Sequence, residues 1–143
     1  MANIIPNAFK AELLSGTHNF ASGGNQFKLA LYTSNPYTAA STAYDTSNEV
    51  SSGSGSGYTT TGLVLQNQSV TAGATSFVDF DDLTFTSVSF GAAFGAIYND
   101  TNSDKLCVVL DFNGTKTATN GDFKIVFPAT GTPANAIISL ANA

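Results

Sequence analysis

Alternation of apolar and polar side chains along short runs is the feature that most constrains how this sequence can fold. In residues 27–32 it places Phe27, Leu29 and Leu31 on one face, and residues 122–127 repeat the pattern. Successive side chains of a β-strand point to opposite faces, so each run predicts a strand with one buried face. Seven or eight such runs separated by polar turns predict an all-β chain, folded as a single antiparallel β-sandwich or small barrel.

Some of these runs carry further detail. Within residues 83–90 the alternation shifts by one residue at Ser87, which predicts a β-bulge. Residues 105–112 are apolar on both faces, which predicts a central strand covered on both sides. The polar stretch that begins at Asn113 is interpreted as a turn. The other predicted strands lie at residues 63–65, 76–80, 93–98 and 136–140.

The N-terminal segment has a different period. Residues 7–14 show helical spacing, with Phe9 and Leu13 on one face. Asn7 is the expected N-cap and Gly16 the expected stop. A single helix of this length is marginal in isolation, so it must dock on the rest of the chain or on a neighbouring chain.

The longest stretch without a strand pattern is residues 33–62, where 18 of 30 residues are Ser, Thr or Gly. A long connection of this kind is usually a functional loop or a disordered one. Because Tyr37, Tyr44 and Tyr58 interrupt it at intervals, we expect a loop attached to the body by aromatic anchors. The expected organisation is an N-terminal helical arm, followed by one β-sandwich domain that contains this loop. The arm takes residues 1–22 and the domain residues 23–143.

Charge is scarce in this chain of 143 residues, with ten acids, five lysines and no arginine, for a net charge of −5. So few cations cannot neutralise many phosphates, and nucleic-acid binding is therefore not expected. No apolar stretch approaches the length of a membrane span, and residues 1–6 lack the pattern of a secretory signal. A single cysteine excludes an intrachain disulfide. We expect neither a membrane partner nor a disulfide scaffold.

The sequence contains few candidate catalytic residues. His18 is the single histidine and is interpreted as a polar loop residue. Cys107 lies inside an apolar strand, where a thiol behaves as a small buried hydrophobe. A nucleophilic pair formed by these two side chains is the alternative. We expect no enzymatic activity and no cofactor.

Acidic residues offer one candidate cation site. Asp100, Asn102 and Asp104 follow the D-x-N-x-D pattern that opens a calcium-binding loop. The sixth position of that loop is Lys105 where the pattern needs Gly, and the following residues have a strand pattern. A hairpin turn explains the segment without a metal ion, so the calcium site is the weaker alternative.

A series of short motifs resembles small structural proteins of tailed bacteriophages, described as capsid decoration, cement or head-fibre proteins. In order, these motifs are FKLALYTS from residue 27, YDTSNEV from 44, GYT from 57, FVDF from 77, AIYND from 96, VLDF from 109 and GDF from 121. The similarity covers about residues 25–140. The family supplies no catalytic residues.

This resemblance implies a virion protein that is made in the host cytoplasm and binds the outer surface of the major capsid protein shell, which it stabilises. It also implies a homotrimer. The expected contacts with the capsid or between subunits are Ile4, Ile5, Phe9, Leu13, Leu14, Tyr37, Tyr44 and Tyr58. A tail-fibre or receptor-binding knob that uses exposed tyrosines to recognise host glycans is the alternative, and a hydrolase or metal-dependent enzyme is a third class.

Overall fold

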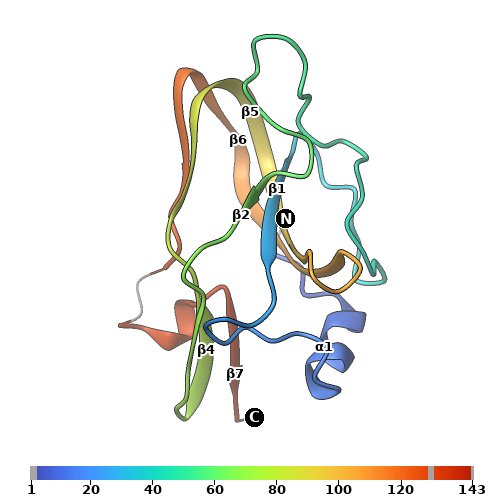
Figure 1. The fold of residues 1–143 in the computed structure, drawn as a ribbon, viewed down its shortest axis with the longest axis vertical. Helices are drawn as coiled ribbons and strands as arrows, with labels where there is room; N and C mark the ends of the chain where they lie inside the picture. Colours follow the sequence, from blue (N-terminus) through green and yellow to red (C-terminus); the bar gives the residue numbers. More distant parts are fainter. Residues whose placement is uncertain (1–2, 129–130, 143) are drawn as a thin grey trace.

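The computed structural model describes residues 3–128 and 131–142. The remaining residues, which the expected domain bounds include, lie outside the described part. Figure 1 shows the elements in chain order. They are α1 (Asn7–Leu14), β1 (Phe27–Tyr32), β2 (Leu63–Val64), β3 (Ser69–Thr71), β4 (Thr75–Asp79), β5 (Leu83–Asn99), β6 (Lys105–Ile125), the 3-10 helix η1 (Pro133–Asn135) and β7 (Ile138–Ala141).

The strands form two antiparallel sheets. The larger sheet has the order β2-β1-β5-β6, and the smaller sheet has the order β3-β4-β7. Side chains of both sheets contribute to one main hydrophobic core, and the strands described form no closed barrel. The prediction of an all-β, sandwich-like fold is therefore confirmed, and the barrel alternative is not.

One long hairpin, β5 with β6, dominates the larger sheet. The two strands pair from Leu83–Ile125 at one end to Asn99–Lys105 at the other. In Figure 1 this ribbon bends over at the top of the view. The prediction of four separate strands here is wrong, because the residues between the runs on each arm of the hairpin either pair or form bulges within the ribbon.

One register shift of that hairpin lies at Ser89, and three further irregularities shape it. The predicted bulge at Ser87 is confirmed, with φ at 55° and a register shift between Phe85 and Val88. A second bulge lies at Cys107, which has no cross-strand partner. In the third, residues 112–115 of β6 lie opposite the single residue Ala93 of β5. This last irregularity replaces the turn expected at Asn113.

Strand β6 lies at the edge of its sheet, which corrects the prediction of a central strand. Its first half is nevertheless covered by segments from elsewhere in the chain. Ile4 and Val109 exchange two backbone hydrogen bonds of 2.9 and 2.8 Å, and Ala43 pairs with Lys105. Buried apolar side chains cover both faces, which is why the sequence resembles that of a central strand.

The N-terminal segment packs against the body of the molecule. The helix prediction is confirmed, although Pro6 is the N-cap where Asn7 was expected. Phe9 is buried in the main core, and the ring of Phe20 stacks on that of Phe27 with centroids 4.2 Å apart. The helix therefore docks on its own domain.

Candidate functional site

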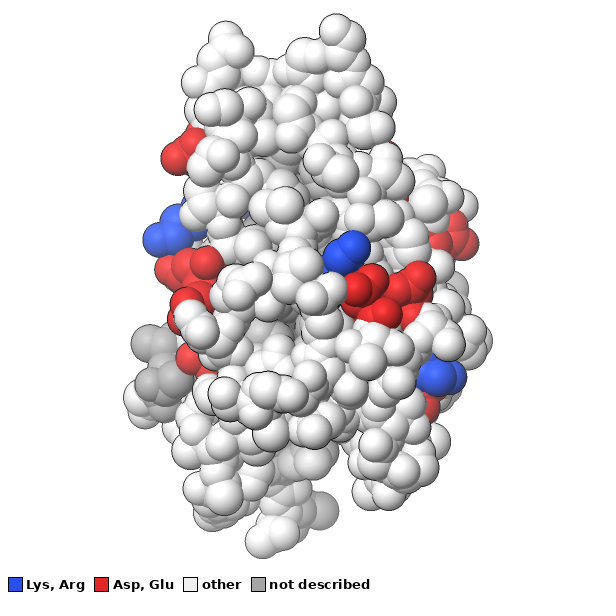
Figure 2. Space-filling view, in the orientation of Figure 1, with Lys and Arg blue, Asp and Glu red and all other residues white. Residues whose placement is uncertain are grey.

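Charged side chains are confined to part of the surface. In the view of Figure 2 they lie in a band across the middle of the molecule, and both ends of the long axis are uncharged. On the face that this view shows, contacts made by either end would rely on shape, hydroxyl and amide groups or apolar area.

An apolar groove lies between the N-terminal segment and the smaller sheet. It has a volume of about 330 Å³, and residues from α1, β3, β4 and β7 line it, with Leu13, Val70 and Leu140 among them. Val70 and Leu140 are 54% and 63% exposed, on the same sheet face as the buried Val78 and Ile138. The apolar face of this sheet therefore continues from the core into solvent. We call this surface the open apolar end.

The structure separates the expected N-terminal contact residues into three groups. Phe9 is fully buried in this chain and offers no area to a partner, so its role as a contact is corrected. Ile4 and Leu13 are partly buried, because they pack against core clusters. Ile5 and Leu14 are 38% and 91% exposed, so both side chains are accessible to a partner.

The tyrosines of residues 33–62 point inward. Tyr37 and Tyr58 are buried and Tyr44 is half-buried, so the first two are corrected as contact residues. The Tyr37 hydroxyl lies 2.6 Å from that of Tyr32, and the Tyr58 hydroxyl accepts the Leu31 N–H at 3.0 Å. These contacts attach the loop to β1, as expected for aromatic anchors.

The Glu49 carboxylate joins three parts of the loop to one another. Its Oε2 accepts the hydroxyl of Tyr44 at 2.5 Å. Its Oε1 accepts the hydroxyl of Tyr58 at 2.7 Å and the N–H of Thr61 at 2.8 Å. Hydrogen bonds to a charged acceptor are stronger than neutral ones, so this carboxylate is a main fastener of the loop. We call Glu49, Tyr32, Tyr37, Tyr44 and Tyr58 together the tyrosine cluster.

Burial raises the pKa of every tyrosine in the chain. Removal from water disfavours the charged phenolate in each case, and the nearby Glu49 carboxylate adds to the effect. The hydroxyls are therefore donors at neutral pH, which suits fastening and not acid–base chemistry.

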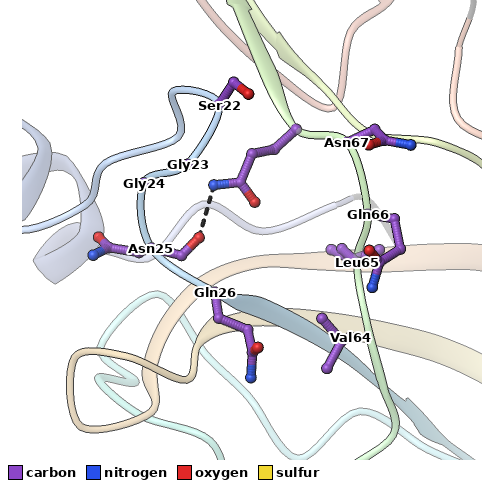
Figure 3. Close-up of a pocket in the computed structure, with 10 residues that line it drawn as sticks. Ser22, Gly23, Gly24, Asn25, Gln26, Val64, Leu65, Gln66 and Asn67 are labelled. Atoms are coloured by element: carbon purple, nitrogen blue, oxygen red, sulfur yellow. Dashed lines mark hydrogen bonds between the residues drawn. The ribbon is translucent and has the colours of Figure 1, made fainter.

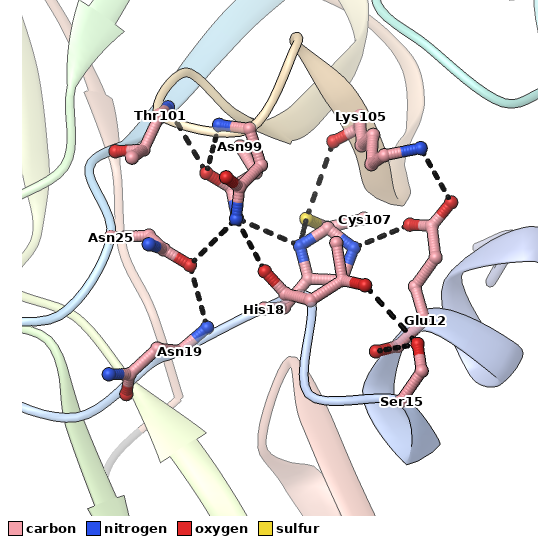
Figure 4. Close-up of polar contacts among 11 residues, drawn as sticks. Glu12, Ser15, His18, Asn19, Asn25, Asn99, Thr101, Lys105 and Cys107 are labelled. Carbon is pink, nitrogen blue, oxygen red and sulfur yellow. Dashed lines mark hydrogen bonds and ion pairs between the residues drawn. The ribbon is translucent and has the colours of Figure 1, made fainter.

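His18 lies in a buried polar cluster (Figure 4). It lies in the loop between α1 and β1, as interpreted, but its side chain is fully shielded from solvent. The Oδ1 atom of Asn99 accepts the N–H groups of Thr101 and Asn102, so its Nδ2 faces His18 Nδ1, 2.9 Å away. Nδ1 must therefore accept, and Nε2 donates to Glu12 Oε2 at 2.6 Å.

The same cluster brings Cys107 next to His18, with Sγ 3.8 Å from Nδ1. In space, the Cys107 thiol, the His18 imidazole and the Glu12 carboxylate follow one another in the order of a nucleophilic triad. However, burial raises the pKa of the Cys107 thiol, and the Asn99 amide already occupies the lone pair that a base would use. Both side chains are enclosed by Phe9, Phe20 and Phe27 and other core residues. The arrangement supports packing and not catalysis.

The three candidate calcium ligands lie in the hairpin turn between β5 and β6, as the turn interpretation requires. Asp100 Oδ2 accepts from Gln26 at 2.6 Å, and its Oδ1 lies 3.6 Å from Lys28 Nζ. Asn102 donates its amide to the carbonyl of Thr17. Within residues 3–128 and 131–142, no group of three or more His, Cys, Asp or Glu side chains could hold a metal ion; Asp104 is one of the residues searched.

A polar pocket of about 290 Å³ lies between residues 22–26 and 64–68 (Figure 3). Gln68 crosses it and donates to the Asn25 carbonyl at 2.7 Å. The labelled side chains of Asn25 and Asn67 point away from one another. The polar groups therefore do not converge on a common ligand position.

Sequence reasoning missed two features of these sites. Asn99 was not singled out as a site residue, because its contact with His18 joins residues 81 positions apart. Strand β3, which carries Val70, has three residues, too few for alternation to show. The available signal for the open apolar end was the predicted strand at residues 136–140, where alternation places Leu140 on the same face as Ile138.

Among the described residues, no helix is both long enough and apolar enough to cross a membrane. Comparison with protein-family models, with curated proteins and with solved structures finds no match to this chain. The geometry of the surface is therefore the basis for assigning a role.

Proposed function

We propose that this chain is a structural protein of a bacteriophage virion, a capsid decoration protein that binds the outside of the major capsid protein shell and stabilises it. The observation that carries the proposal is the open apolar end. Val70 and Leu140 expose large apolar side chains there, beside a groove that leads into the core. Contiguous exposed apolar surface of this kind marks a site of protein interaction.

The rest of the molecule suits a passive surface role. The His18 and Cys107 side chains are enclosed, and the tyrosine cluster holds residues 33–62 against the body. A weakly charged skin of hydroxyl and amide groups gives little non-specific attraction to nucleic acid. The motif resemblance to phage structural proteins points the same way.

The proposed attachment predicts a clear effect of charge at the open apolar end. Leu140→Asp is expected to weaken binding to shells that lack the protein by tenfold or more, because burying an unpaired carboxylate costs more than about 1.4 kcal/mol. Val126→Asp is the matched control. Val126 is 66% exposed and does not line the groove. Binding is measured by co-sedimentation with purified shells.

Two results would contradict the proposal: wild-type protein that does not bind shells, or a Leu140→Asp variant that binds as tightly as Val126→Asp. The homotrimer belongs to the proposal and is checked by analytical ultracentrifugation. The receptor-binding alternative needs exposed tyrosines. Tyr37 and Tyr58 are buried and offer no surface to a glycan.

A further inference from the structure

A second groove lies on the flank of the long hairpin, along the half of β6 that the N-terminal segment leaves uncovered. Its volume is about 390 Å³, within the range of about 300–1,000 Å³ usual for small-ligand sites. We call it the β6 groove. It is lined by Phe112, Lys116, Thr117, Asp122, Phe123, Lys124 and Ile125.

The irregularity at residues 112–115 creates this groove. Four residues of β6 lie opposite Ala93 alone, so Phe112 and Lys116 lie on either side of a widened stretch of the ribbon. Phe112 is half-buried, and its ring centroid lies 6.3 Å from that of Phe123. The floor is therefore aromatic, and the rim is polar.

The charged side chains on the rim differ in whether they have a partner. Lys124 Nζ lies 3.1 Å from Asp82, and Asp122 Oδ1 accepts the N–H of Ser87 at 3.3 Å. Lys116 pairs with Ala92 in the ladder, but within the part of the chain that the structure describes its side chain makes neither an ion pair nor a hydrogen bond. Asp82 therefore offsets the charge of Lys124, whereas the ammonium group of Lys116 has no such partner among the described residues. An anionic group is therefore favoured near Lys116.

We propose that the β6 groove binds an acidic sugar residue, with its ring over Phe112 and its carboxylate at Lys116. The electron-rich face of an aromatic ring suits the weakly positive C–H face of a pyranose. The Thr117 hydroxyl and the Asp122 carboxylate supply acceptors for sugar hydroxyls. This site goes beyond the capsid role and does not depend on it.

The test uses the full chain and two probes, D-glucuronate and D-glucose, which share a ring and differ in the carboxylate. Amide chemical shifts are followed by NMR during titration. Glucuronate is expected to shift residues 112–125 in a saturable way and to bind more tightly than glucose. Lys116→Gln is expected to weaken glucuronate binding about threefold, because an exposed ion pair contributes modestly. Lys10→Gln, an exposed lysine on α1, is expected to change nothing.

Several results would overturn the proposal. These are the absence of saturable shifts, shifts that lie outside the groove, equal affinity for the two sugars, or equal affinities of the Lys116→Gln and Lys10→Gln variants. A C-terminal carboxylate of a peptide is the competing anion. Stronger binding of N-acetyl-phenylalanine than of glucuronate would also reject the sugar assignment. Capsid co-sedimentation of Lys116→Gln is expected to match wild type, so the two proposals fail separately.

Discussion

Two segments outside the sheets flank β1, and different chemistry fixes each of them to the larger sheet. The first, residues 3–26, buries Phe9 and Phe20 in the main core. The second, residues 33–62, is held by tyrosine hydroxyls that meet Glu49 and the main chain. One segment is anchored mainly by apolar area, and the other mainly by hydrogen bonds whose donors can lose a proton.

The difference shows what a polar loop needs in order to be ordered. Most of residues 33–62 are hydroxyl-bearing or glycine, and composition alone would allow a flexible linker. A few aromatic side chains with a polar tip provide both packing and hydrogen bonds, which apolar anchors cannot do. The tyrosine cluster should therefore be the more pH-sensitive of the two anchors.

Alkaline pH is expected to have the largest effect. Folding raises the pKa of Tyr32, Tyr37, Tyr44, Tyr58 and Tyr98 above the ordinary value of 10.0. Below pH 10 both states keep their protons and the stabilisation is complete. As the pH rises past 10, the unfolded chain releases protons first, so stability falls. Tyrosinate absorbance should appear together with loss of the folded circular dichroism signal.

Hydrogen exchange should distinguish the two anchors at a pH below that of global unfolding. Amides of residues 33–62 should lose protection at a lower pH than those of residues 7–20, after correction for the intrinsic rise in exchange rate. Tyrosines that ionise near pH 10 in a chain that stays folded would contradict the assignment of the hydroxyls as fasteners.

Gly62→Ala is expected to be the most damaging single substitution in the loop. Gly62 has φ at 77°, and a Cβ there would lie 1.9 Å from the carbonyl oxygen of Leu29. Left-handed strain and the clash together should cost about 3–5 kcal/mol in the free energy of unfolding. Gly55→Ala is the control, because its φ is 85° and nothing lies within 4 Å of the added Cβ. Urea denaturation should show a loss of only about 1–2 kcal/mol for that variant.

The strand pattern in the sequence could be predicted because period-two alternation is local. It located β1 and β4, and the slip at Ser87 revealed a bulge. It failed for β6, where apolar side chains on both faces indicated a central strand. The edge is covered by backbone pairing of Ile4 with Val109, and a contact across 105 positions leaves no local pattern.

The candidate sites show the same limit. The sequence indicated that Tyr37 and Tyr58 anchor a loop, yet the same residues were also assigned as external contacts. Alternation cannot say whether an aromatic side chain buries itself in its own chain or in a partner. The burial of His18 was missed for a related reason, because its partners Glu12 and Asn99 come from a helix and from the far end of a strand.

Glu49→Ala should weaken the loop anchor directly. It leaves the hydroxyls of Tyr44 and Tyr58 and the N–H of Thr61 without their acceptor, at a cost of about 3 kcal/mol in total. Hydrogen exchange should rise mainly within residues 33–62. Asp45→Ala serves as the control, since that carboxylate is exposed and its hydrogen bonds are with the neighbouring Ser47, and its effect should be much smaller. Equal effects would show that Glu49 is not the main fastener.

His18→Gln should produce the smallest of these losses, about 2 kcal/mol, because Gln keeps a donor and an acceptor but does not fill the ring's place among Phe9, Phe20 and Phe27. Cys107 lies beside His18 and reports on this region. Its labelling by a thiol reagent requires the N-terminal segment to open, so the substitution should speed labelling. Exchange in residues 33–62 should change less than labelling does. If both rates rise equally, the two segments open as one unit, and the separation of apolar from hydrogen-bonded anchoring does not extend to their dynamics.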